Sequence, residues 1–387
     1  MESKNFIDKF YEKYGNRNKK PVLFFSPGRV NLIGEHTDYN GGFVFPCALT
    51  YGTYLLIRKI DGDLLKFSTL NFNSDAEVEL KGLFANTGKK WINYPLGVIN
   101  EFIRKGTKIT GLEFLYFGDV PNGAGLSSSA SIEMVTAVAL NEFFNADIST
   151  LELVRMSQKA ENNFVGMNCG IMDQFASGFG KKDHAIFLNC DTLFYENVPV
   201  ILNDCSLIIT NTNKRRGLTD SKYNERRSEC DKAVELLQAY KPVRNLSEIN
   251  ISEIPLLDKY IKDPIIRNRA RHVISENERV VEAVKVLKEN NIDRFGELMN
   301  MSHDSLKDDY EVTGTELDTL VYEGRKLQGV IGTRMTGAGF GGCTVSIVKK
   351  AHITKFTSDL SSVYQKMTGL VPDFYLPQIG NGAGRIG

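Results

Sequence analysis

Residues 28–42 restrict the folding of this chain most, because they combine an arginine, two carboxylates, a histidine and four glycines in one short segment. The segment follows the apolar run Val-Leu-Phe-Phe at residues 22–25, which predicts a buried strand. Glu35, His36 and Asp38 lie too close together to share one face of a helix, and burying them without partners would be costly. We therefore expect a binding loop at the end of a strand, with donors and acceptors suited to a polyhydroxylated ligand.

A second glycine-rich segment, Pro-Asn-Gly-Ala-Gly-Leu-Ser-Ser-Ser-Ala-Ser at residues 121–131, follows the apolar run at 112–117 and precedes an amphipathic stretch at 132–144. Glycines let backbone N–H groups approach a phosphate, serines add hydroxyl donors, and a helix N-terminus attracts anions. Taken alone, the segment is equally compatible with an ordinary turn that ends in an N-cap serine. The presence of the other motifs in the same chain favours an anion-binding loop.

A third glycine-rich segment, Met-Thr-Gly-Ala-Gly-Phe-Gly-Gly at residues 335–342, has the spacing G-x-G-x-x-G. The strand-like run Cys-Thr-Val-Ser-Ile-Val at 343–348 follows it, whereas a dinucleotide-binding motif requires a helix at that point. The sequence context therefore argues against a dinucleotide site.

Four motifs, which occur in the family's order along the chain, resemble those of the galactokinases within the GHMP small-molecule kinases. Residues 28–42 resemble the galactokinase signature, 121–131 the family's ATP loop, and 336–342 its third motif. Gly-Ile-Met-Asp-Gln at 170–174 resembles the segment that holds the catalytic aspartate. The first motif separates galactokinases from other family members, whereas the second and third are shared across the family.

The resemblance implies an α/β (α+β) fold of two domains, with the active site in the cleft between them. We expect an N-terminal domain, residues 1–182, that carries the sugar signature and the ATP loop, and a C-terminal GHMP-kinase-like domain, residues 183–387. Hydrophobic periodicity predicts strands at 22–25, 53–59, 64–70, 112–117, 185–188, 206–210, 343–348 and 373–376, and helices at 6–14, 92–103, 132–144, 149–164, 219–240, 271–289 and 353–367.

The resemblance also implies a reaction, transfer of the γ-phosphoryl group of ATP to the C1 hydroxyl of α-D-galactose, which gives galactose 1-phosphate and ADP at the start of galactose catabolism. Asp173 is the implied base and Arg29 its partner. A sugar hydroxyl is a poor nucleophile at neutral pH, so a positioned carboxylate and a cation near the developing charge have a clear purpose. Mg²⁺ is the implied cofactor, with Ser129 and Glu161 as its protein ligands.

Without the resemblance, Asp173 is more readily explained as a turn residue, and Glu161 as the solvated face of an amphipathic helix. The resemblance implies wider sets of contacts for both substrates. The expected sugar contacts are Arg29, Glu35, His36, Thr37, Asp38, Gly170, Asp173 and Tyr223. The expected nucleotide contacts are Ser68, Gly123, Ala124, Gly125, Leu126, Ser127, Ser128 and Ser129.

Charge and hydropathy restrict the partners of the chain. Lys+Arg 47 balances Asp+Glu 47, so no global field favours a nucleic acid or an anionic membrane. The sequence has no uninterrupted apolar run that approaches the roughly 20 residues of a membrane helix. We therefore expect a cytoplasmic protein whose partners are galactose and ATP.

Two alternatives remain at this point. The first is a kinase of the same family that acts on N-acetylgalactosamine. The second is a non-catalytic sensor that binds galactose and ATP and contacts a repressor, and its expected mark is a damaged ATP loop or a missing base. Residues 125–131 and Asp173 match the catalytic pattern, which favours an enzyme.

Overall fold

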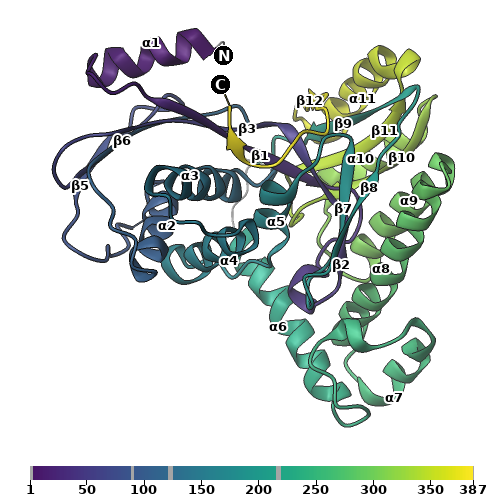
Figure 1. Ribbon diagram of the computed structural model, residues 1–387. Helices are drawn as coiled ribbons and strands as arrows, with labels where there is room; N and C mark the ends of the chain where they lie inside the picture. The colour runs from purple at the N-terminus through teal and green to yellow at the C-terminus, as the bar shows by residue number, and fades with distance from the viewer. Residues whose placement is uncertain (1–2, 89–90, 121–124, 215–218, 387) are drawn as a thin grey trace.

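A six-stranded sheet organises the N-terminal part of the computed structural model, which describes residues 3–88, 91–120, 125–214 and 219–386. Figure 1 shows that helices cover both faces of this sheet. In spatial order the strands are β13 (Gly384–Arg385), β1 (Val22–Asn31), β3 (Pro46–Lys59), β6 (Leu112–Gly118), β4 (Leu64–Thr69) and β5 (Ala76–Glu79). Helix α1 (Ser3–Tyr14) lies on one face, and the other face carries α2 (Asn93–Arg104), α3 (Ser128–Phe144), α4 (Thr150–Ala160) and α5 (Met172–Phe179).

Strand directions bring two of the predicted motifs to one edge of this sheet. β1 and β6 are each antiparallel to β3, so they run in the same direction and end at the same edge. Arg29 lies near the end of β1. The second glycine-rich segment, which we call the serine-rich loop from its residues 125–131, follows β6. The stacked rings of Phe67 and Phe114, with centroids 4.7 Å apart, lie in the core between the sheet and the four helices.

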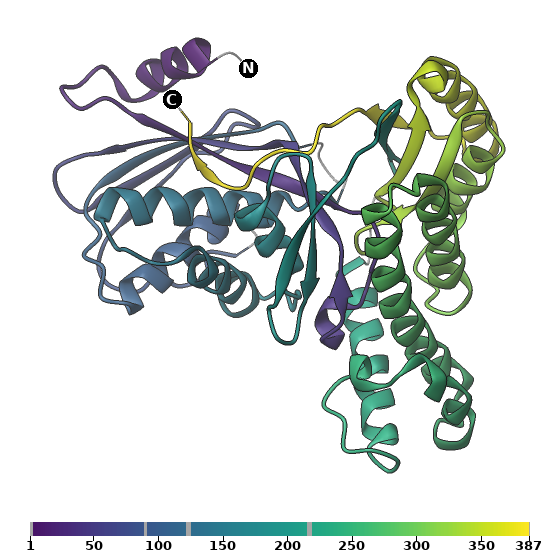
Figure 2. The ribbon, with the colours of Figure 1, turned by 45° about the vertical axis from the view of Figure 1, so that its right-hand side comes forward.

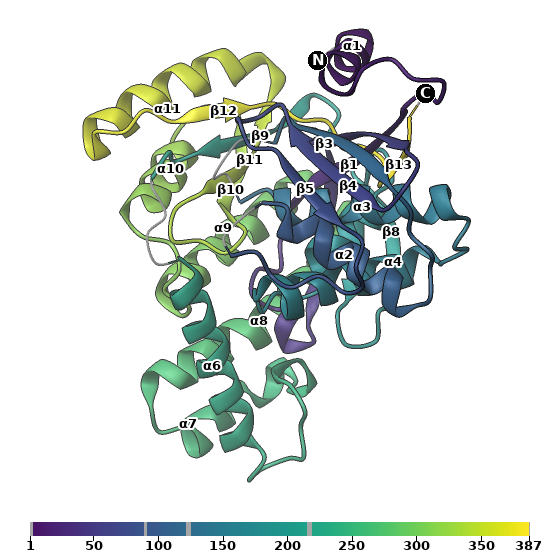
Figure 3. The ribbon, with the colours of Figure 1, turned by 90° about the vertical axis from the view of Figure 1, so that its left-hand side faces the viewer.

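A four-stranded antiparallel sheet organises the C-terminal part, where helices cover it (Figure 2). Its order is β10 (Val330–Thr336), β11 (Cys343–Lys349), β9 (Cys205–Asn211) and β12 (Asp373–Tyr375). The helices packed beside it include α9 (Ile292–Asp308), α10 (Thr315–Arg325) and α11 (Ile353–Thr368). Figure 3 shows a helical lobe that extends away from both sheets and contains α6 (Thr219–Leu237), α7 (Leu257–Tyr260) and part of α8 (Pro264–Lys288).

One hydrophobic cluster spans the two parts. Val30 and Phe45 from the N-terminal part pack in the same buried cluster as Val280 of α8, Phe295 of α9 and Val345 of β11. The N-terminal and C-terminal parts are therefore packed against each other through buried side chains.

A small third sheet connects the halves of the chain. Its strands are β2 (Phe43–Val44), β7 (His184–Asn189) and β8 (Tyr195–Pro199), and β7 pairs with β2. Residues 184–199 thus fold back onto the N-terminal part, whereas β9 begins the C-terminal sheet. The predicted division near residue 182 falls just before this return, and it stays a prediction.

The end of the described chain fastens the helix that carries Asp173. Figure 2 shows this segment crossing from the C-terminal sheet to the edge of the six-stranded sheet. The N–H of Gly380 donates to Ala48 O over 2.9 Å, and the N–H of Ala383 donates to Ser177 O of α5 over 2.7 Å. Within the described residues, every helix falls short of the length and apolarity needed to cross a bilayer.

Candidate active site

A cavity of about 320 Å³ lies where β1, α3, α5 and α6 meet, and we call it the central cavity. Most of the residues predicted from the sequence line it, although they come from segments far apart in the chain. These are Arg29, Glu35, His36, Asp38, Gly125, Leu126, Ser127, Ser128, Ser129, Glu161, Gly170, Asp173 and Tyr223.

A β-bulge turns Arg29 toward the cavity. The register between β1 and β3 shifts between Pro27 and Arg29, and such bulges redirect side chains beside functional sites. A Cβ atom at Gly28 would lie 2.5 Å from Leu126 O, so only glycine lets the serine-rich loop approach this strand. The N–H of Arg29 donates to Leu126 O over 3.2 Å, and the loop is thereby docked on the bulge.

Arg29 and Asp173 form a two-bond ion pair at the wall of the cavity. Arg29 Nε donates to Asp173 Oδ1 over 2.8 Å and Nη2 donates to Oδ2 over 2.9 Å. Only 5% of the arginine is exposed, and its Nη1 donates to Gly125 O over 2.8 Å. This geometry fixes the carboxylate plane and ties it to the serine-rich loop.

Ser127 adds a third hydrogen bond to the same carboxylate. Its hydroxyl donates to Asp173 Oδ2 over 2.5 Å. The serine has φ +60°, in the left-handed region that is uncommon for residues other than glycine. Strained backbone of this kind collects at functional sites, and here it directs a hydroxyl onto the predicted base.

Asp38 is a half-buried acid that also lines the central cavity, at the start of the short 3₁₀ helix η1 (Asp38–Asn40). Burial and the negative charge of Asp173 raise the pKa of Asp38 to about 6. A Cβ atom at Gly170 would overlap the carboxylate oxygen Oδ2. Glycine at position 170 is therefore required for Asp38 to keep this position.

His36 is held as a neutral ring. Its Nε2 lies 3.2 Å from Ala338 O, which can only accept, so Nε2 carries the proton and Nδ1 accepts from Tyr39 Oη over 2.9 Å. Burial lowers the pKa of His36 to about 3. The ring of Tyr223 on α6 lies 5.7 Å from the His36 ring, so α6 closes this side of the cavity.

Glu35 lines the cavity, but protein groups occupy both of its oxygens. Oε1 accepts from the N–H of Gly337 over 2.8 Å and lies 3.0 Å from the Thr336 hydroxyl. Oε2 accepts from Asn31 Nδ2 over 2.7 Å and pairs with Arg334 Nη2 at 2.7 Å. A carboxylate has about four acceptor positions, so these contacts favour a role in which Glu35 joins the first and third motifs.

Two predicted contacts lie away from the cavity. The Thr37 hydroxyl is buried and bonds the carbonyl oxygens of Gly34 and Phe43, which closes the turn of the sugar signature. Ser68 of β4 is buried on the α1 face of the sheet, where its Oγ accepts from Tyr14 Oη over 2.9 Å. Alternate strand residues face opposite sides of a sheet, so Ser68 points away from the central cavity, and its contact with the nucleotide stays a prediction. Gly123 and Ala124 lie outside the described residues.

Glu161 and Ser129 approach each other from different helices. Glu161 begins η2, a short π-helix (Glu161–Val165), and π-helical turns often occur at functional sites. Burial raises the pKa of Glu161, and the nearby Ser129 hydroxyl opposes that shift. Within the described residues no cluster of three or more His, Cys, Asp or Glu side chains could hold a metal ion. A hydroxyl beside a buried carboxylate nevertheless fits Mg²⁺, which takes one or two protein oxygens and completes its shell with phosphates and water.

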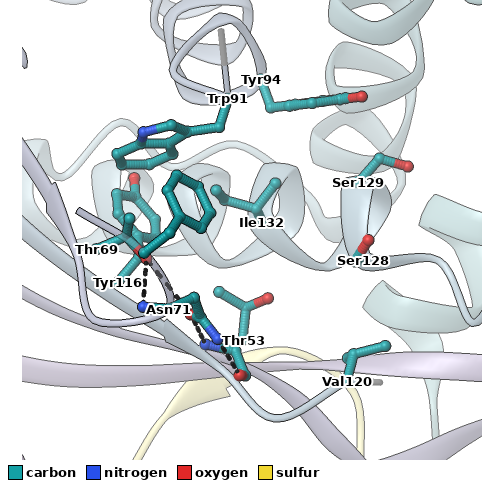
Figure 4. A pocket seen from close by; sticks show the side chains of 12 residues that line it. Thr53, Thr69, Asn71, Trp91, Tyr94, Tyr116, Val120, Ser128, Ser129 and Ile132 are labelled. Carbon is teal, nitrogen blue, oxygen red and sulfur yellow. Dashed lines mark hydrogen bonds between the residues drawn. The ribbon is translucent and has the colours of Figure 1, made fainter. Parts of the chain in front are cut away.

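A second cavity, of about 190 Å³, opens beside Ser128 and Ser129, and no sequence motif predicted it. We call it the aromatic pocket. Figure 4 shows Trp91 and Tyr116 at one end and Ser128 and Ser129 at the other. In the sequence, the feature that could have indicated this pocket is Trp91, the single tryptophan of the chain, immediately before a predicted helix. Phe72, Thr53, Thr69, Asn71, Tyr94, Gly118, Val120 and Ile132 complete the lining.

Family models match three separate regions of the chain. The model described as the galactokinase galactose-binding signature matches residues 8–59. The models of the GHMP kinases N terminal domain and the GHMP kinases C terminal match residues 93–181 and 283–366. The first match covers the segment that supplies Arg29 and Asp38 to the central cavity.

Full-length relatives agree with these models. Galactokinase from Fusobacterium nucleatum is 51% identical over 99% of both chains, and galactokinase from Bacillus subtilis is 49% identical over 98% of this chain and 96% of its own. The crystal structure of Lactococcus lactis galactokinase complexed with galactose is 44% identical and superposes with a TM-score of 0.96 over 99% of both chains. Mevalonate kinase from Methanococcus jannaschii, 20% identical with a TM-score of 0.70 over 95% of this chain and all of its own, shares the fold.

Proposed function

The chain belongs to the galactokinases of the GHMP kinase family, and we propose that its central cavity transfers the γ-phosphoryl group of ATP to the C1 hydroxyl of α-D-galactose. The products are galactose 1-phosphate and ADP. The observation that carries the assignment of roles is the Arg29–Asp173 pair, which faces the same cavity as Asp38 and the serine-rich loop.

Asp173 is the proposed base in this reaction. The sugar lies between Asp173 and the wall formed by His36, Asp38 and Tyr223, with its C1 hydroxyl within hydrogen-bond reach of Asp173. The carboxylate orients this hydroxyl and takes its proton as the oxygen attacks the γ-phosphorus atom. Arg29 then stabilises the charge that develops between the sugar oxygen and the phosphoryl group.

ATP is proposed to occupy the space between the serine-rich loop and the aromatic pocket. The N-terminus of α3, at Ser128 and Ser129, offers backbone N–H groups and a positive dipole end to the phosphates. These two serines line both cavities. The rings of Trp91 and Phe72, 6.2 Å apart, offer an apolar surface to the base of the nucleotide.

Mg²⁺ is proposed at Ser129 and Glu161, whose oxygens would hold it while it neutralises charge on the β- and γ-phosphates of ATP. The two-domain division at residue 182 and the cytoplasmic location remain predictions.

The substrate assignment is tested by ADP release with ATP and a panel of acceptors. We expect turnover with galactose and much less with glucose, because an acceptor aimed at the axial C4 hydroxyl would be left unpaired by the glucose epimer. Faster turnover with N-acetylgalactosamine would favour a kinase for that sugar. Tight galactose binding without ADP release would identify a sensor.

Replacing Asp38 with asparagine is expected to weaken galactose binding far more than ATP binding. The change removes a charged acceptor from a desolvated wall, which costs about 1.5–3 kcal/mol, or roughly 10- to 150-fold in sugar affinity. Calorimetry with galactose and with a non-hydrolysable ATP analogue measures both constants. Asp191→Asn is the matched control, because Asp191 pairs with the exposed Arg244 outside the central cavity. Equal losses for both ligands in Asp38→Asn would contradict the separation of sugar and nucleotide sites.

The same side chain predicts a pH dependence. Because the pKa of Asp38 is raised to about 6, its charged form is lost as the pH falls through that value. Galactose affinity is therefore expected to fall below about pH 6 in the wild type and to lose this component in Asp38→Asn. Calorimetric titrations between pH 5 and 8 in both proteins check the prediction.

Replacing Glu161 with glutamine is expected to raise the Mg²⁺ concentration for half-maximal rate by about tenfold or more, because a hard anionic ligand is lost. The change should leave the fold intact, since burial already disfavours the charge of Glu161. Glu152→Gln on the preceding helix, where the side chain pairs with Lys105 at the surface, is the control. An unchanged magnesium titration in Glu161→Gln would remove this residue from the metal site.

A further inference from the structure

A buried amide and a second buried acid lie directly behind Glu161. Gln174 of α5 and Glu133 of α3 are both completely buried, and neither lines the central cavity. Gln174 Nε2 lies 2.5 Å from Glu161 Oε2 and 3.1 Å from Glu133 Oε2. One side-chain nitrogen therefore donates its two N–H groups to two different carboxyl groups.

This bridge determines which end of the amide faces Glu161. Both neighbours present acceptor oxygens, so the NH₂ end must point between them. Without Glu133 the amide could rotate by half a turn and place its own oxygen against Glu161. The arrangement leaves Gln174 Oε1 and Glu133 Oε1 without a hydrogen-bond partner among the described residues, and unsatisfied buried polar atoms of this kind call for an explanation.

Gln174 and Cys169 both contact the same oxygen of Glu161. Cys169 Sγ lies 3.4 Å from Oε2, the atom that also accepts from Gln174. Oε1 is free of both contacts, so it can serve a ligand in the central cavity that Glu161 lines. Partners of this type orient a metal-binding carboxylate, and their loss typically costs about 10- to 100-fold in metal affinity or activity.

We propose that Gln174, with its amide oriented by Glu133, positions Glu161 to bind a divalent cation. The inference rests on the proposed role of Glu161. It assigns a positioning function to two buried side chains that do not line the central cavity. Neither residue touches the sugar wall at Asp38, so the effect is confined to the metal side of the site.

Gln174→Met tests the proposal, because methionine has a similar length and cannot donate a hydrogen bond. We expect Mn²⁺ binding to the enzyme–ADP complex, titrated by electron paramagnetic resonance without turnover, to weaken by about tenfold. The Mg²⁺ concentration for half-maximal rate should rise in parallel, while galactose affinity stays within about twofold, as expected if the change acts only on the metal ligand.

Two replacements of Glu133 separate orientation from packing. Glu133→Leu removes the acceptor and should weaken Mn²⁺ binding as Gln174→Met does, and an apolar side chain of similar size is commonly tolerated at a buried charged position. Glu133→Gln keeps a carbonyl oxygen for Gln174 and should restore binding to near the wild-type value. Glu142→Gln, at the exposed end of α3 where Glu142 pairs with Arg385, is the control.

Wild-type Mn²⁺ affinity in a folded Gln174→Met protein would overturn the proposal, and so would equal losses in Glu133→Gln and Glu133→Leu. The same titration on Glu161→Gln separates this inference from the proposed function. If Glu161→Gln weakens Mn²⁺ binding and Gln174→Met does not, only the positioning role is wrong. If Glu161→Gln also leaves Mn²⁺ binding unchanged, the assignment of the metal ligand is wrong.

Discussion

Asp173→Asn is expected to lower kcat at least about 100-fold while galactose binding stays within about tenfold, as is typical when a general base is lost. Asparagine keeps the shape of the side chain but cannot take the proton of the C1 hydroxyl. It can still accept from Ser127, whose hydroxyl lies 2.5 Å from Asp173 Oδ2. The loss should therefore appear mainly in the chemical step.

Single-turnover quench experiments measure that step without interference from product release, which limits the turnover of many kinases. Galactose and nucleotide affinities come from calorimetry on the same protein. The melting temperature must be compared first, because the change leaves the buried Arg29 without its charged partner. Turnover close to wild type in a folded variant would remove Asp173 from its proposed role.

Local patterns predicted much of the site because its chemistry is concentrated in short motifs. Arg29, Asp38 and Ser129 are all in such motifs, and all reach the central cavity. The position of Ser68 beside Tyr14 was not predictable, because a single residue carries no information on which face of a strand it occupies. Glu133 was not distinguishable from an ordinary residue of an amphipathic helix, since its proposed role depends on its hydrogen bond with Gln174 in a different helix.

The same distinction applies to the helices and strands: local sequence patterns predict some of them, whereas others depend on tertiary contacts. β1 and β6 follow continuous apolar runs and were identified, whereas α9 and β10 were not. A Cβ atom at Gly332 of β10 would clash with the backbone of Gly296 in α9, so both glycines exist for a close approach between the two elements. In the sequence they only weaken the helical and strand patterns.

The third glycine-rich motif acquires a different role from the one that its composition suggests. Gly337 donates to Glu35, and the carbonyl of Ala338 accepts from His36. Gly337 also faces the serine-rich loop, where a Cβ atom would lie 3.2 Å from Gly125 O. This motif thus holds the sugar signature in place from the C-terminal side, and Glu35 is its main attachment point.

Glu35→Gln is therefore expected to destabilise the protein by about 3–5 kcal/mol, the usual cost of removing one partner from a buried ion pair. Arg334 is completely buried and would keep an uncompensated charge. The amide would also direct donor hydrogens at groups that are themselves donors, Gly337 N on one side or Asn31 Nδ2 on the other. Urea unfolding followed by circular dichroism measures the change in midpoint.

Two further variants define what that result means. Asp359→Asn breaks the exposed pair with Lys355 and should change stability by no more than about 0.5 kcal/mol. Adding Arg334→Met to Glu35→Gln should recover much of the loss, because apolar residues often replace a buried ion pair without cost. If Glu35 instead served only as a sugar contact, Glu35→Gln would unfold at the wild-type urea concentration and lose galactose affinity alone, and the role of the third motif as an attachment for the sugar signature would be wrong.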